Sequence, residues 1–342
     1  MIRVLVIDDS AMVRQVLRRE LSKERDIQVV GVAPDPYVAR ELIIKTKPHV
    51  LTLDIEMPRM DGLTFLRKIM KYHPIPTIIV SSLTSRGSKI ALDALEYGAF
   101  DIITKPGVAY SVADAIEIIV RQIRAASVAD ISRLTARRNR SERQPQRYSL
   151  ARTTQKVVLI GGSTGATIAL EELLLPMPPN APGMAVVIHM PPGFTSSFAK
   201  RLDSMCAVQV REAVHGDQIL PGRVLLAPGN YHMEVLRRGA GYYVRLHQKE
   251  RLFYQRPCVD LLFRSGARYI APNGVAVMLT GMGKDGASAM GEFVQAGGKA
   301  LIQDEASSIV WGMPGEAFKQ GVSRTTIPLQ QMARAILHSV TE

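Results

Sequence analysis

The chain has few of the features that indicate a secreted or membrane protein. Its 342 residues include only two cysteines, Cys206 and Cys258, and their spacing matches neither a metal site nor a redox pair. No apolar run approaches the roughly 18–20 residues that a membrane-spanning helix needs. The N-terminus is too acidic and too short in apolar sequence for a signal peptide, and reads as a strand. We therefore expect a cytoplasmic protein that does not insert into membranes.

Acidic residues are also scarce, with 31 against 43 basic residues and a net charge of +12. Much of this excess lies in residues 121–152, where nine arginines face only Asp130 and Glu142. That segment has no apolar periodicity, which is typical of a flexible, Arg-rich linker and argues against a folded nucleic-acid-binding surface. Docking of an acidic partner on it stays an open alternative. The chain is thus expected to divide into domains 1–125 and 155–342, joined by linker 126–154.

Strand and helix patterns alternate five times in the first domain. Amphipathic stretches at helical spacing separate the apolar runs. This alternation predicts an α/β fold with a doubly wound parallel sheet of the flavodoxin-like kind, whose site lies at the carboxyl ends of the strands. The expected strands are Arg3–Ile7, Gln28–Ala33, Val50–Leu53, Thr77–Val80 and Phe100–Thr104.

Three carboxylates fall at those carboxyl ends. Asp8 and Asp9 follow the first strand, and Asp54 follows the third. Carboxylates that meet at one edge repel each other unless a cation lies among them, and oxygen ligands of this kind suit Mg²⁺. We therefore predict a Mg²⁺ site formed by these three residues.

The same edge is predicted to accept a phosphoryl group. Asp54 would be the nucleophile, Lys105 after the fifth strand would pair with the developing charge, and Ser81 after the fourth would bind a phosphate oxygen. Ser82 is the alternative for this last role. The domain resembles the receiver domains of bacterial two-component response regulators. The motifs that carry the resemblance are Val6-Ile7-Asp8-Asp9-Ser10, Leu53-Asp54-Ile55-Glu56-Met57-Pro58-Arg59-Met60-Asp61-Gly62 and Thr104-Lys105-Pro106.

The second domain has a strand, a glycine turn, a serine and a helix in sequence, centred on Ser163. This order lifts a nucleophilic oxygen above a sheet. Two later apolar runs end just before His189 and shortly before Asp285. Alone, the histidine reads as structural and the aspartate as a helix N-cap. Together with Ser163 they supply the nucleophile, the base and the orienting carboxylate of a serine hydrolase, which needs no cofactor.

The fold expected for this domain is a second doubly wound parallel sheet, Rossmann-like, with a small β-rich insertion over residues 207–250. Three histidines lie in that insertion and read as structural or surface groups. Only His232 is a candidate for the rim of the cleft.

Several motifs in the second domain resemble the chemotaxis protein-glutamate methylesterases. They are Gly161-Gly162-Ser163-Thr164-Gly165, His189-Met190-Pro191-Pro192-Gly193-Phe194-Thr195, Leu226-Ala227-Pro228-Gly229-Asn230-Tyr231-His232-Met233, Arg256-Pro257-Cys258-Val259-Asp260, Leu279-Thr280-Gly281-Met282-Gly283-Lys284-Asp285-Gly286-Ala287 and Gly312-Met313-Pro314-Gly315.

This resemblance implies a phosphorylation-activated response regulator that hydrolyses glutamate γ-methyl esters on chemoreceptors for chemosensory adaptation. It implies the catalytic triad Ser163, His189 and Asp285, with Thr164 and the Met282 amide at the oxyanion. The implied partners are methylated cytoplasmic domains of chemoreceptors and a chemotaxis histidine kinase as phosphodonor. Deamidation of receptor glutamines is a further implied activity.

Three other readings remain. A non-catalytic, phosphorylation-dependent receptor adaptor conflicts with the intact serine, histidine and aspartate set. A transcriptional regulator conflicts with the absence of a helix-turn-helix pattern from the second domain. A hydrolase of the same fold acting on another protein ester is compatible with every motif in the sequence.

Overall fold

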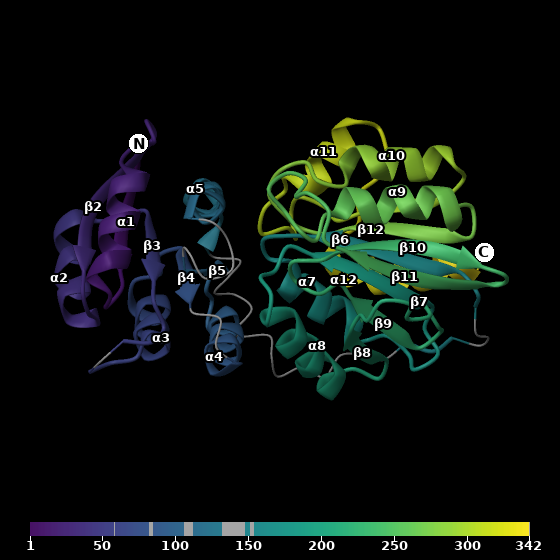
Figure 1. Ribbon diagram of the computed structural model, residues 1–342, viewed down its shortest axis with the longest axis horizontal. Helices are drawn as coiled ribbons and strands as arrows, with labels where there is room; N and C mark the ends of the chain where they lie inside the picture. Colours follow the sequence, from purple (N-terminus) through teal and green to yellow (C-terminus); the bar gives the residue numbers. More distant parts are fainter. Residues whose placement is uncertain (58, 82–84, 106–111, 132–147, 151–153, 342) are drawn as a thin grey trace. The chain divides into compact units, whose positions relative to one another are not determined.

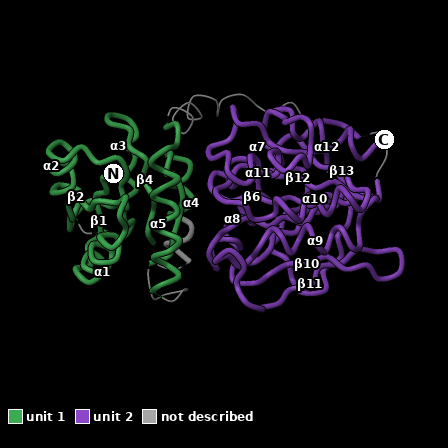
Figure 2. Tube along the Cα trace, turned by 90° about the horizontal axis from the view of Figure 1, so that it is seen from above, with its two compact units in different colours: residues 1–143 green, residues 144–342 purple. Residues whose placement is uncertain are grey.

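The computed structural model describes residues 1–57, 59–81, 85–105, 112–131, 148–150 and 154–341 (Figure 1). The chain forms two compact units, residues 1–143 and 144–342 (Figure 2). Most of the segment expected to be a linker, residues 132–147 and 151–153, lies outside the described residues. Of its start, residues 126–128 belong to the last helix of the first unit.

The first unit is a five-stranded parallel sheet with strand order β2-β1-β3-β4-β5. This is the flavodoxin-like order, so the predicted fold class is confirmed for this unit. The strands are β1 (Ile2–Ile7), β2 (Ile27–Ala33), β3 (Val50–Leu53), β4 (Thr77–Ser81) and β5 (Asp101–Thr104). The helices are α1 (Ala11–Leu21), α2 (Pro36–Thr46), α3 (Gly62–Tyr72), α4 (Ser85–Glu96) and α5 (Val112–Val128).

Local sequence explains where these helices begin. The side chains of Ser10, Asp35 and Asp61 accept hydrogen bonds from the backbone N–H groups of the first turns of α1, α2 and α3. Such N-caps each contribute about 1 kcal/mol. Helix α1 packs against α5, and α3 packs against α4. The helices therefore cover the sheet and leave the carboxyl ends of its strands for the loops.

The second unit contains a six-stranded parallel sheet with strand order β13-β12-β6-β7-β9-β8. The strands of the unit are β6 (Val157–Gly162), β7 (Gly183–Ile188), β8 (Gln209–Glu212), β9 (Arg223–Leu226), β10 (His232–Arg238), β11 (Gly241–His247), β12 (Gly274–Met278) and β13 (Lys299–Ile302). The helices are α7 (Ala166–Leu174), α8 (Phe194–Met205), α9 (Val259–Tyr269), α10 (Ala287–Gln295), α11 (Met313–Lys319) and α12 (Leu329–Thr341).

The expected β insertion over residues 207–250 is only partly correct. Strands β8 and β9 fall in that range but pair in parallel with the main sheet and extend it beyond β7. Only β10 and β11 form a separate antiparallel hairpin. The alternating pattern identified the strands, but a pattern along the chain does not say which neighbour each strand pairs with.

Helices cover both faces of this sheet. Helix α10 packs against both α9 and α11 on one face, and α7 packs against α12 on the other (Figure 1). The core between the sheet and the first of these layers includes Leu159, Phe263, Met278 and Phe293. Among the residues that the structure describes, no helix is both long enough and apolar enough to cross a membrane.

Gly266 tests the packing of α9 on the sheet. A Cβ at this position would lie 2.2 Å from Cδ1 of Leu159 and 3.2 Å from the ring of Phe293. We predict that Gly266→Ala destabilises the second unit by about 1–3 kcal/mol, because the packed core must shift. Denaturant unfolding followed by the fluorescence of Trp311, the one tryptophan of the chain, reports this unit.

The matched control is Gly291 in α10, where an added Cβ would meet its nearest neighbour, Cγ2 of Val322, at an ordinary 3.7 Å. Gly291→Ala should be neutral or stabilise the unit by up to about 1 kcal/mol, because alanine favours the helix. Equal effects of the two substitutions would contradict the packing argument.

Candidate functional site

Three neighbouring strands of the second sheet bring Ser163, His189 and Asp285 to one edge. Strand β6 lies between β12 and β7, and all three run in parallel. Ser163 comes directly after β6, His189 directly after β7, and Asp285 in the loop between β12 and α10. The chain passes from β6 to β7 on one side of β6 and only later returns to β12 on its other side, so the strand order reverses at β6. The carboxyl ends of these strands are therefore a topological switch point, where parallel α/β sheets bind their ligands.

The three side chains form a continuous hydrogen-bonded chain. Oγ of Ser163 lies 3.0 Å from Nδ1 of His189, and Nε2 of His189 lies 2.7 Å from Oδ2 of Asp285. Since Asp285 is a carboxylate, Nε2 of the ring carries the proton that it receives, and Nδ1 is left to accept from the serine hydroxyl. The side chains of His189 and Asp285 are only 6% and 2% exposed. A base within reach of a serine, itself held by a carboxylate, is the arrangement that activates a nucleophile.

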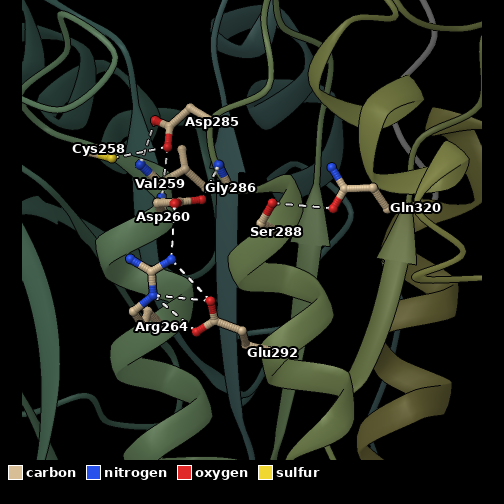
Figure 3. Close-up of polar contacts among 9 residues, drawn as sticks. All are labelled: Cys258, Val259, Asp260, Arg264, Asp285, Gly286, Ser288, Glu292 and Gln320. Atoms are coloured by element: carbon tan, nitrogen blue, oxygen red, sulfur yellow. Dashed lines mark hydrogen bonds and ion pairs between the residues drawn. The ribbon is translucent and has the colours of Figure 1, made fainter.

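Besides its contact with His189, Asp285 lies against the first residues of α9 (Figure 3). Its Oδ2 also accepts from the Val259 amide at 2.8 Å, and its Oδ1 accepts from the Asp260 amide at 2.9 Å and the Cys258 thiol at 3.0 Å. Burial by itself would raise the pKa of Asp285, but hydrogen bonds from His189, Cys258 and the Val259 amide outweigh it and hold that pKa below its ordinary value. The carboxylate therefore stays ionised deep in the protein.

The turn that bears Ser163 is packed closely against neighbouring segments, with glycines at the points of closest contact. Gly165 adopts a left-handed φ of +80° at the N-cap of α7, and a Cβ there would lie 2.7 Å from Ile309. The amide of Ser163 donates to the carbonyl of Thr280, and a Cβ on Gly281 would lie 2.8 Å from Cβ of Ser163. The backbone that leads to Met282 therefore runs alongside the serine.

Thr164 is buried directly after Ser163, and Met282 is half-buried after Gly281. Both of the residues that we predicted for the oxyanion thus lie next to the nucleophile in the chain or in space. Their role in binding an oxyanion stays a prediction.

A second loop supports the one that bears His189. A Cβ on Gly229, after β9, would lie 2.4 Å from the Pro192 nitrogen and 2.5 Å from the Pro191 carbonyl carbon. The Gly229 amide donates to Oγ1 of Thr195, which is fully buried. The loop after β9 and the loop after β7 are therefore packed backbone to backbone, which limits how far the imidazole can move.

The carboxylates of the first unit also converge. Asp8, Asp9 and Asp54 can each offer one oxygen such that all three lie within 4.8 Å of one another. Nζ of Lys105 lies 2.8 Å from Oδ2 of Asp54 and 3.2 Å from Oδ2 of Asp8. Ser81 ends β4, is fully buried, and accepts a backbone hydrogen bond from the Lys105 amide at 3.0 Å. Its alternative, Ser82, lies outside the described residues.

This cluster holds more negative charge than its partners neutralise. Burial raises the pKa of Asp54 to about 6 and also raises the pKa of Asp8, although Lys105 acts in the opposite direction on both. Oδ2 of Asp8 is buried and accepts no hydrogen bond, despite its ion-pair distance to Lys105. An oxygen-only set with such an unsatisfied carboxylate oxygen fits Mg²⁺.

Comparison with known proteins finds a match for each of the two units. The CheB methylesterase family matches residues 158–336, and the response regulator receiver domain matches residues 4–117. A protein-glutamate methylesterase/protein-glutamine glutaminase of Syntrophus aciditrophicus is 51% identical over 99% of this chain and 99% of its own length. A protein of the same name from Anaeromyxobacter dehalogenans is 48% identical over 100% of this chain and 96% of its own.

The crystal structure of the Thermotoga maritima CheB methylesterase catalytic domain superposes with a TM-score of 0.53 at 33% identity. It covers 54% of this chain and 99% of that domain.

The chain belongs to the CheB methylesterase family. The predictions of a carboxylic ester hydrolase and of a response regulator with a receiver domain are thereby confirmed. The predicted class of two parallel-sheet α/β domains is confirmed as well.

Sequence reasoning missed some residues around the esterase site. Cys258 was noted in the sequence only as part of no metal site or redox pair. It is fully buried and donates to Asp285, and burial raises the pKa of its thiol so that it keeps its proton. Asp260 was not singled out. His232, the candidate rim residue, is fully buried and its Nε2 lies 2.9 Å from the carbonyl of Glu250. Cys258 and Asp260 both belong to the short motif of residues 256–260 quoted above, and that motif was the signal available in the sequence.

The raised pKa of Asp54 leads to a prediction about the stability of the first unit. The pKa of Asp54 is raised from 3.8 to about 6 in the folded state. Ionised Asp54 therefore lowers the free energy of unfolding, and this destabilisation grows as the pH rises from 3.8 and is complete above about pH 6. We predict that Asp54→Asn, in a chelator and at pH 8, stabilises the first unit by about 2–3 kcal/mol. The gain should fade as the pH falls from about 6 towards 3.8. Calorimetry of the full chain resolves the effect as a shift of the receiver transition.

Asp61→Asn is the control. Burial raises the pKa of Asp61, but hydrogen bonds from Thr64 outweigh it, so the pKa lies below its ordinary value. Asparagine caps a helix about as well as aspartate does. No gain is expected there. A stabilisation by Asp54→Asn that did not depend on pH would contradict the argument.

Proposed function

We propose that this protein is a phosphorylation-activated serine esterase that hydrolyses γ-methyl esters of glutamate on the cytoplasmic domains of chemoreceptors. The observation that supports it most directly is the continuous contact from Ser163 through His189 to Asp285, at 3.0 and 2.7 Å. Relatives of nearly full-length similarity carry the name protein-glutamate methylesterase/protein-glutamine glutaminase. A protein with this role works in the cytoplasm.

The reaction proceeds in two halves. Oγ of Ser163 attacks the ester carbonyl while its proton passes to Nδ1 of His189, and the carbonyl electrons move to the oxygen. Thr164 and the Met282 amide stabilise this oxyanion. The carbon–oxygen bond to the methyl group's oxygen then breaks, and methanol leaves with the proton from His189. Water, activated by the same base, hydrolyses the acyl-enzyme to glutamate and free serine.

Asp285 supports each proton transfer. It holds the ring with Nε2–H towards itself and stabilises the imidazolium that forms when Nδ1 takes the serine proton. The same sequence of steps with a glutamine side chain expels ammonia instead of methanol, which would be the glutaminase activity.

The receiver supplies the regulation. Asp54 accepts a phosphoryl group from a histidine kinase of the chemotaxis system, Lys105 pairs with the added charge, and Ser81 binds a phosphate oxygen. Asp8, Asp9 and Asp54 would hold Mg²⁺, which when bound neutralises charge on the transferring group. The unphosphorylated receiver restricts access to the esterase site, and phosphorylation relieves this restriction.

Ser163→Ala tests the nucleophile. The substitution should lower methanol release from a methylated receptor fragment by at least about 10⁴-fold, because no other group supplies the attacking oxygen. Phosphorylation of Asp54 by a small-molecule phosphodonor should remain at its normal level, which shows that the receiver is intact, and unfolding followed by Trp311 fluorescence controls for the fold of the second unit. Turnover that persists in this variant would refute the assignment.

Two variants test the regulation. Removal of residues 1–125 should raise basal methanol release about tenfold, as expected if the receiver covers the site roughly nine-tenths of the time. A relative's catalytic domain has been crystallised by itself, so the truncated chain is expected to fold. Asp54→Ala in the full chain should abolish stimulation by a phosphodonor. Equal rates for the truncated and the unphosphorylated full chain would exclude inhibition by the receiver.

A further inference from the structure

A second buried carboxylate lies directly behind Asp285. Asp260 is the second residue of α9 and is 6% exposed. Its backbone amide donates to Oδ1 of Asp285, while its own Oδ1 accepts from the amide of Gly286, the N-cap of α10, at 2.8 Å. Asp285 thus accepts from an amide in the first turn of α9, the helix that contains Asp260 (Figure 3). In return, Asp260 accepts from the N-cap amide of α10, the helix that follows Asp285. This exchange ties the loop that bears Asp285 to the start of α9.

The charge of Asp260 is only partly neutralised. Nη2 of Arg264, one turn along α9, lies 3.4 Å from Oδ2 of Asp260. The same guanidinium is closer to Glu292 on α10, with Nε 3.0 Å from Oε2 and Nη2 3.1 Å from Oε1. Burial, and then the charge of Asp285, raise the pKa of Asp260. The protein therefore keeps two carboxylates side by side in its interior. The arginine nearest to them, Arg264, is shared with Glu292 and neutralises their charge only in part.

A purely structural cap would not need that charge. Asparagine at position 260 would accept the hydrogen bond from the Gly286 amide equally well and would avoid both desolvation and repulsion from Asp285. A negative charge behind Asp285 has a chemical consequence instead. It stabilises the imidazolium of His189, which exists only while the serine proton is in transit.

We propose that Asp260 is a positioning residue, whose carboxylate fixes the loop of Asp285 and adds a second negative charge behind the serine–histidine–aspartate chain. The inference rests on the proposed function, because it assigns Asp260 a role through His189. Other titratable or charged groups face this pair: His189 after β7, His232 on β10, Cys258 before α9, Arg264 in α9 and Glu292 in α10.

Of these groups, the Cys258 thiol stays neutral, because burial raises its pKa. Burial lowers the pKa of His232, so that it too is neutral near pH 7. Arg264 and Glu292 largely balance each other. The charge that distinguishes this site from an ordinary triad is thus the one on Asp260.

The test measures how fast a fluorophosphonate probe labels Ser163 in the full chain between pH 5 and 9. In this reaction the serine oxygen bonds to phosphorus, fluoride leaves, and the serine proton goes to the base. Asp260→Asn should move the acidic limb of the rate profile to lower pH by about 0.5–1 unit, because a protonated base becomes less stable. The rate on the plateau should fall by roughly three- to tenfold.

Arg264→Gln should do the opposite. It removes the positive charge beside Asp260 and leaves Glu292 unneutralised, so the acidic limb should move to higher pH, by a smaller amount because the guanidinium is half-exposed. Ser288→Ala is the matched control. Ser288 lies on α10, like Glu292, and its hydroxyl donates to Gln320 at the end of α11, away from both aspartates (Figure 3). Removal of this hydroxyl should leave the profile unchanged.

The outcomes separate the possible explanations. If Asp260→Asn lowers the rate with no shift of the acidic limb, or if both charge variants shift it in the same direction, the proposal is wrong and Asp260 is only a cap. Trp311 fluorescence on thermal unfolding shows whether either variant has lost its fold. If the unmodified protein is not labelled at Ser163 at any pH, it is the proposed function that fails.

Discussion

The esterase site depends on how the protein buries one negative charge, the carboxylate of Asp285. An isolated buried carboxylate costs several kcal/mol, so it is retained only where donors surround it. Asp285 has four such donors: the imidazole of His189, the thiol of Cys258 and the first two amides of α9. These come from the loop after β7 and from the start of α9, while Asp285 itself follows β12. Satisfying the charge therefore holds three separate segments in the geometry that the serine requires.

The receiver site is built on the opposite electrostatic principle. There the buried carboxylates are under-satisfied: burial raises the pKa of Asp54 to about 6, and one oxygen of Asp8 accepts no hydrogen bond. Lys105 relieves only part of the repulsion. Such a cluster gains free energy from any cation that enters it. One chain thus has an esterase site in which both oxygens of Asp285 accept hydrogen bonds, and a receiver site in which a carboxylate oxygen of Asp8 accepts none. The first arrangement suits a permanently formed catalytic site, and the second suits a site that changes when a cation or phosphoryl group binds.

Most differences between the expected and observed structure concern pairing and burial. Strands β8 and β9 were expected within a separate insertion, yet they join the main sheet next to β7. His232 was considered for the rim of the cleft and is fully buried. Both depend on which segments meet in three dimensions. The alternation of apolar residues located the strands to within one or two residues, but it holds no information about their neighbours.

The sequence by itself determined the two α/β domains, the family, and the positions of Ser163, His189, Asp285 and the acidic set around Asp54, because polar residues after apolar strands must share a sheet edge. Only the tertiary structure decided that Nδ1 of His189 faces the serine, since ring orientation depends on where the carboxylate lies. It alone also placed Asp260 and Cys258 against Asp285. Those contacts join segments that are far apart in the chain, and a local sequence pattern does not predict which distant segments meet.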